Sequence, residues 1–91
     1  MTDAPRPYEL AWEPEAIDRL TALVHEYPEA AQAVIPAIYE LGADPRPTGS
    51  TPLGTGGIRR LLLGYFRATY QVTDDPPVVR IIVVGRADRP R

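Results

Sequence analysis

The sequence predicts an α+β fold in which a helical hairpin covers one face of a small antiparallel sheet. Residues 14–41 carry apolar side chains at helical spacing, whereas residues 57–86 contain three short runs rich in Val, Ile, Tyr and Thr, which favour strands. A short alternating segment around residues 8–12 precedes the helices and reads as a first strand. These observations give the order β-α-α-β-β-β within one domain that spans residues 1–91.

The boundaries follow from turn and helix-start residues. Pro14 suits the first position of a helix over residues 14–26, and Pro28 starts a second helix that runs to about residue 41. Pro36 lies inside the second helix and is expected to kink or split it. A Pro- and Gly-rich loop is expected at 43–57. The predicted strands after this loop are 57–63, 65–73 and 78–85.

Side-chain alternation along these strands predicts one apolar face and one basic face. On the middle strand, Phe66 and Tyr70 alternate with Arg67 and Gln71. On the last strand, the expected apolar face consists of Val79, Ile81 and Val83. The opposite face is then expected to present four guanidinium groups, namely Arg60, Arg67, Arg80 and Arg86.

Charge is divided unevenly along the chain. Residues 1–45 hold two Arg and nine Asp or Glu, whereas residues 46–91 hold eight Arg and three Asp. This division favours a basic surface for an anionic partner. The chain has no Lys, so all ten of its Lys-or-Arg positions are arginines, whose planar guanidinium suits phosphate. Glu13, Glu15 and Asp18 are interpreted as charges that complement the first turn of a helix.

Several classes of function are disfavoured by composition. The chain has no Cys, and His25 is its only histidine, so thiolate chemistry and a His-based metal site are not expected. No apolar run approaches the ~18 residues needed to span a bilayer. The N-terminus is unlike a signal peptide, which favours the cytoplasm. We expect no metal and no cofactor.

Four sequence segments resemble the RelE/ParE superfamily of bacterial toxin–antitoxin toxins, and together they extend over nearly the whole chain. They are Tyr8–Ala16 (YELAWEPEA), Leu41–Pro47 (LGADPRP), Gly64–Val72 (GYFRATYQV) and Val83–Arg86 (VVGR). The resemblance implies a toxin that inhibits growth and is neutralised by a cognate protein antitoxin. In the RelE-like branch, which we favour, it implies a ribosome-dependent mRNA interferase.

Such an endoribonuclease needs no metal, because the ribose 2′-hydroxyl attacks the adjacent phosphate. The resemblance implies that Arg67 stabilises the pentavalent phosphorane and that Arg60 and Arg86 complete the catalytic set. Four further arginines of the basic half are expected to contact RNA, namely Arg46, Arg59, Arg80 and Arg89.

The family pattern is incomplete here, which leaves alternatives open. Leu62 occupies a position that is often basic, and the chain lacks the Tyr or His that many active members carry after the last strand. Tyr65 and Tyr70 are substitutes for the general base, although Tyr70 alternates onto the apolar face. The alternative functions are a ParE-like inhibitor of DNA gyrase and a catalytically impaired homologue that only binds its antitoxin.

Overall fold

The computed structural model describes residues 7–87, in which two helices and five strands follow one another. They are β1 (Glu9–Trp12), α1 (Pro14–Glu26), α2 (Glu29–Glu40), β2 (Ser50–Pro52), β3 (Ile58–Leu63), β4 (Phe66–Asp74) and β5 (Pro77–Arg86). The α+β fold class is confirmed, and α1 has the predicted bounds. β3, β4 and β5 begin or end within one residue of the predicted strands.

The five strands form one sheet in the order β1-β5-β4-β3-β2. The pairs among β2, β3, β4 and β5 are antiparallel, whereas β1 runs parallel to β5, so the sheet is mixed at this edge. A parallel pair needs a long crossover, which the helices and the intervening strands provide. β2 lies inside the segment predicted as a loop, and it is only three residues long.

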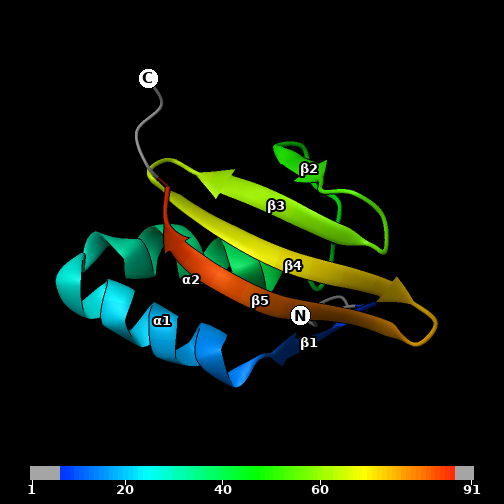
Figure 1. Ribbon diagram of the computed structural model, residues 1–91, viewed down its shortest axis with the longest axis horizontal. Helices are drawn as coiled ribbons and strands as arrows, with labels where there is room; N and C mark the ends of the chain where they lie inside the picture. Colours follow the sequence, from blue (N-terminus) through cyan, green and yellow to red (C-terminus); the bar gives the residue numbers. More distant parts are fainter. Residues whose placement is uncertain (1–6, 88–91) are drawn as a thin grey trace, which may run out of the picture.

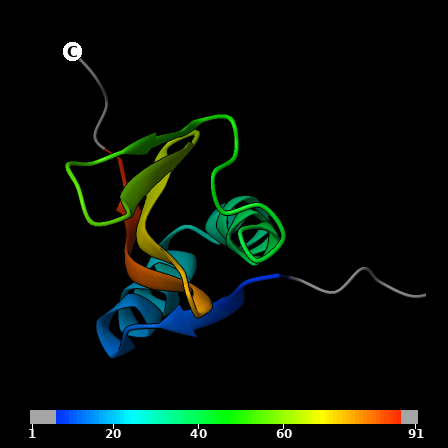
Figure 2. The ribbon, with the colours of Figure 1, turned by 90° about the vertical axis from the view of Figure 1, so that its right-hand side faces the viewer.

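Both helices lie on one face of the sheet, as Figures 1 and 2 show. α1 packs on β5, and α2 packs on β4 and β3. Their buried residues meet the inward side chains of the strands in one core. The largest fully buried side chains of this core are Tyr70, Ile38, Leu41, Ile81, Val34, Val79 and Val84.

Pro36 does not split the second helix, because α2 continues through it to Glu40. Proline removes one backbone donor and leaves the carbonyl four residues earlier without its helical partner. Pro36 is exposed, and so is Gln32, the residue whose carbonyl loses that bond, so water can hydrate it. Within residues 7–87, no helix is long and apolar enough to cross a membrane.

Candidate functional site

The sheet face opposite the helices, called the outer face below, carries Arg60 and Arg67. Arg67 is exposed, whereas its neighbours in β4, Phe66 and Ala68, are buried. It lies between Leu62 of β3 and Gly85 of β5. Arg60 lies opposite Thr69, two positions along β4 from Arg67. Because side chains two residues apart share a face, both arginines project to the same side of the sheet.

Arg80 of β5 joins these two residues on the outer face. It lies opposite Gln71, the next outward residue of β4 after Thr69. Its Nη1 is 3.4 Å from the Glu13 Oε2, and both side chains are about half exposed. The three arginines thus share one face, as side-chain alternation predicted for them, and we call Arg60, Arg67 and Arg80 the outer arginine set.

Two members of the outer arginine set have unused hydrogen-bond donors. Within residues 7–87, the side chain of Arg67 makes no hydrogen bond, ion pair or ring contact. The Nε of Arg60 is buried and has no hydrogen-bond partner in the same part of the chain. A guanidinium presents five donors in a rigid fork that matches phosphate geometry. The exposed guanidinium of Arg67 therefore gives the outer face free capacity for an anionic ligand.

A β-bulge places Arg86 on the opposite side of the sheet, so the expectation that it shares a face with Arg67 is wrong. Thr69 pairs with Val83 and Tyr70 with Ile81, which leaves Ile82 as an extra residue in β5. One extra residue reverses the alternation beyond it. The expected apolar face is thus also wrong at Val83, which is partly exposed on the outer face, whereas the following Val84 is buried.

Arg86 instead lies against aromatic rings on the helix side. Its Nη1 donates a 2.7 Å hydrogen bond to the hydroxyl of Tyr27, at the C-terminal end of α1. Its guanidinium carbon is 4.8 Å from the centre of the Tyr27 ring and 5.9 Å from that of Tyr65. These contacts hold the cation away from the outer arginine set. Arg89, which was expected to contact RNA, lies outside the described residues.

Two further arginines expected to contact RNA also lie away from the outer arginine set. Arg59 faces the helix side of β3 and donates hydrogen bonds to the hydroxyl and carbonyl of Ser50 in β2. Arg46 lies at the far end of β4, 3.1 Å from the Asp74 carboxylate. Tyr8 also donates a 2.6 Å bond to that carboxylate. The hydrogen bonds from Tyr8 and Arg46 hold the pKa of Asp74 below its ordinary value.

The tyrosines considered as a general base do not lie on the outer face. Tyr70 is fully buried, and its hydroxyl donates a 2.8 Å bond to the carbonyl of Pro45. Tyr65 lies in the turn between β3 and β4 and is largely exposed, beside Arg86. Among residues 7–87, the outward positions of the strands hold no tyrosine and no histidine.

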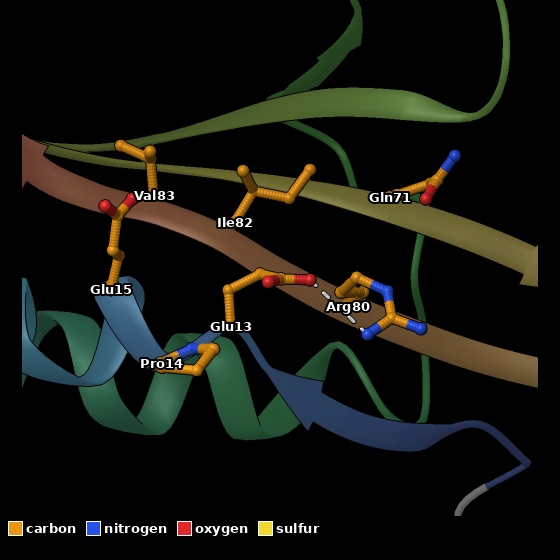
Figure 3. A pocket seen from close by; sticks show the side chains of 7 residues that line it. All are labelled: Glu13, Pro14, Glu15, Gln71, Arg80, Ile82 and Val83. Carbon is orange, nitrogen blue, oxygen red and sulfur yellow. Dashed lines mark hydrogen bonds and ion pairs between the residues drawn. The ribbon is translucent and has the colours of Figure 1, made fainter.

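A cavity of about 410 Å³ opens beside the outer arginine set, between the start of α1 and β5. Figure 3 shows the Glu13 carboxylate turned toward Arg80 and the Glu15 carboxylate beside Val83. Its lining consists of Glu13, Pro14, Glu15, Gln71, Arg80, Ile82 and Val83. The sequence pattern predicted for the two glutamates only a place in the first turn of a helix. In the described part of the chain, no cluster of three or more acidic or histidine side chains could hold a metal ion.

Solved structures with the same fold are toxins of toxin–antitoxin systems. The isolated RelE toxin of E. coli has a TM-score of 0.72 and 26% identity, over 92% of this chain and 88% of that one. The archaeal RelE–RelB complex from Pyrococcus horikoshii OT3 gives a TM-score of 0.77 at 21% identity, over 92% and 99% of the two chains. A chromosomal ParDE system from P. aeruginosa gives 0.73 at 20% identity, over 92% and 100%. No protein-family model and no curated protein matches the sequence.

Proposed function

The chain has the fold of RelE/ParE superfamily toxins, and from this premise we propose that it is the toxin of a type II toxin–antitoxin system. We assign it the RelE-like activity, ribosome-dependent cleavage of mRNA. The observation that carries this assignment is the outer arginine set, in which Arg67 is exposed and unpaired within residues 7–87. A strand of RNA is a polyanion, and unpaired guanidinium groups on one face provide its phosphates with charge-assisted hydrogen bonds.

The cleavage reaction places specific demands on this face. The ribose 2′-oxygen attacks the adjacent phosphorus as its proton passes to a water molecule, the P–O5′ bond breaks, and a 2′,3′-cyclic phosphate forms. The leaving 5′-oxygen takes up a proton from water. Negative charge accumulates on the non-bridging oxygens in the transition state, where fixed cations stabilise it. We assign this role to Arg67 and Arg60 and assign Arg80 to binding the RNA strand. Arg86 faces the helices, so we assign it no contact with the phosphate.

Expression without an antitoxin tests the proposal. We expect growth arrest, and we expect primer extension on cellular transcripts to reveal cuts within translated codons. Arg67→Ala should reduce cleavage by about 100-fold, the scale for removing one donor to a developing oxyanion. The matched control is Arg19→Ala, because Arg19 is an exposed arginine of α1 outside the outer face. Growth arrest with intact transcripts would contradict the assignment as an mRNA interferase.

A ParE-like inhibitor of DNA gyrase is the second candidate. It is favoured by the absence of a tyrosine or histidine from the outward strand positions of residues 7–87, because an inhibitor needs no general base. A supercoiling assay with purified gyrase distinguishes the two, since an mRNA interferase leaves supercoiling unchanged at excess toxin. A homologue that only binds its antitoxin would leave growth, transcripts and supercoiling unaffected.

The proposed partner is a cognate antitoxin. It is supported by solved neighbours such as the RelBE2 complex from Mycobacterium tuberculosis and the intact RelBE complex from E. coli. A toxin that acts on translating ribosomes would work in the cytoplasm. Co-expression with the product of the adjacent open reading frame should restore growth and yield a complex that co-purifies with the toxin. Failure of this product to bind would leave the toxin without the partner that the proposal requires.

A further inference from the structure

The cavity between α1 and β5 lies on the same surface as the unpaired arginines. Val83, in its wall, pairs with Thr69, which in turn pairs with Arg60, so the three residues form one row across β5, β4 and β3. Neighbouring strands are about 4.8 Å apart, so the two ends of this row are separated by roughly 10 Å. A nucleotide whose phosphate contacts Arg60 and Arg67 can therefore place a base over β5.

The cavity has a surface suited to the face of a flat ring. The bulge turns both Ile82 and Val83 toward it, and Pro14 adds an apolar wall (Figure 3). Arg80 contributes its planar guanidinium at one side. Unstacked RNA bases are commonly held by stacking on guanidinium planes and by hydrogen bonds to their Watson–Crick edges. Apolar and guanidinium surfaces together therefore fit a nucleobase.

The two carboxylates limit which ligand fits. Glu13 accepts a hydrogen bond from Arg80, whereas Glu15 has no hydrogen-bond or ion-pair partner within residues 7–87. A carboxylate only accepts hydrogen bonds and repels a phosphate. It can accept two bonds at once from a base that offers two adjacent N–H donors. The free carboxylate thus favours a neutral base with such an edge.

We propose that this cavity is a base-selective subsite and that it binds guanine of the RNA strand held by the outer arginine set. Guanine alone among the four bases has adjacent donors, N1–H and the 2-amino group, on its Watson–Crick edge. Adenine and cytosine place a ring-nitrogen acceptor beside the amino group, and uracil has one N–H between two carbonyls. The Glu15 carboxylate can accept both hydrogen bonds from the guanine edge, whereas on the other three bases it would face at least one acceptor, which it repels. This inference rests on the proposed function, because it requires RNA on the outer face.

Titration of the ¹⁵N-labelled protein with 5′-GMP, 5′-IMP, 5′-AMP, 5′-CMP and 5′-UMP tests the proposal. We expect GMP to shift the amide signals of Ile82 and Val83 and to bind roughly tenfold more tightly than AMP, the scale of one bidentate base contact. IMP lacks the 2-amino group and should bind with intermediate affinity. Glu15→Gln should abolish the preference for GMP, because an amide cannot accept two bonds along that edge.

Glu29→Gln is the matched control, since Glu29 occupies the first turn of α2 as Glu15 does in α1. It should retain the preference for GMP. Equal affinity for all five nucleotides, or a preference that survives in Glu15→Gln, would overturn the subsite. Phosphate-dependent shifts around Arg67 and Thr69 together with cleavage of ribosome-bound mRNA would then still support the proposed function. Their absence alongside a GMP preference would contradict that function and with it the assignment of the subsite to RNA.

Discussion

The Arg86 guanidinium donates a 2.7 Å hydrogen bond to the Tyr27 hydroxyl and lies over the same ring. This contact joins the end of β5 to the C-terminal end of α1. Tyr27 also packs edge-on against Phe66, with ring centres 6.2 Å apart. Arg86 thus connects a strand end to the helical layer, which is a structural role that the sequence pattern did not indicate.

We expect Arg86→Ala to lower stability more than activity. Loss of the hydrogen bond and of the cation–π contact should reduce the free energy of unfolding by about 1–2 kcal/mol. Tyr27→Phe removes only the hydrogen bond, so it should reduce the free energy of unfolding by about 1 kcal/mol or less. Urea denaturation measures both, and cleavage of ribosome-bound mRNA should remain close to wild type once both proteins are folded. Loss of cleavage in folded Arg86→Ala would restore this residue to the catalytic set.

The sequence predicted the elements whose periodicity is unambiguous. Apolar spacing identified α1 and α2, and alternation identified the outward position of Arg67. It could not identify the bulge at Ile82, because the segment between Arg80 and Arg86 (IIVVG) contains no polar residue that would mark the change of side. The side of the sheet on which Arg86 lies depends on that single residue.

The sequence pattern did not predict the candidate cavity either. Glu13 and Glu15 are far in sequence from Arg80, and only the parallel pairing of β1 with β5 brings the start of α1 beside that strand. Register between distant strands is not encoded in local periodicity. The first-turn position of Glu15 was evident from the sequence, whereas its neighbours on β5 required the tertiary structure.

Tyr70→Phe separates a core role from a catalytic one. The buried hydroxyl donates to the carbonyl of Pro45, which is itself buried, so the substitution leaves an acceptor without its partner. We expect a loss of about 1–3 kcal/mol in the free energy of unfolding. Growth arrest and the pH dependence of mRNA cleavage should be unchanged below the unfolding temperature. A change in the pH profile would instead identify Tyr70 as the base.

The Asp74 carboxylate should make stability depend on acidic pH. Tyr8 and Arg46 lower its pKa in the folded protein below the ordinary value near ~3.9. A lowered folded pKa contributes stability that is present above the unfolded pKa and is lost as pH falls through the folded pKa. Asp74→Asn should therefore be less stable than wild type at pH 7, and the difference should shrink as pH falls below the ordinary pKa and vanish below the lowered pKa of the folded state. Urea denaturation across pH 2–7 measures this.

Asp75→Asn is the control for that experiment, since the neighbouring carboxylate makes none of these contacts in the described residues. Asp75→Asn should therefore lose less stability at pH 7 than Asp74→Asn. If the stability difference from wild type shrinks equally in both variants as pH falls, general charge, rather than the contacts of Asp74, sets the acid sensitivity.

Gly57 should be the least replaceable glycine at the start of β3. Its φ is +83°, and a Cβ there would lie 2.4 Å from the carbonyl oxygen of Val72. The backbone must stay close, because the Val72 N–H donates a 2.9 Å bond to the Gly57 carbonyl. Gly57→Ala therefore combines left-handed strain with a backbone clash, and we expect it to cost about 2–4 kcal/mol.

Gly54→Ala provides the comparison, because Gly54 also has a positive φ (+69°) but nothing within 4 Å of an added Cβ. Only the strain of the left-handed conformation remains there, about 1–2 kcal/mol. Thermal and urea denaturation of the two variants should rank Gly57→Ala as clearly the less stable. Equal losses would show that the close approach to Val72 relaxes at little cost and that conformational strain alone determines both values.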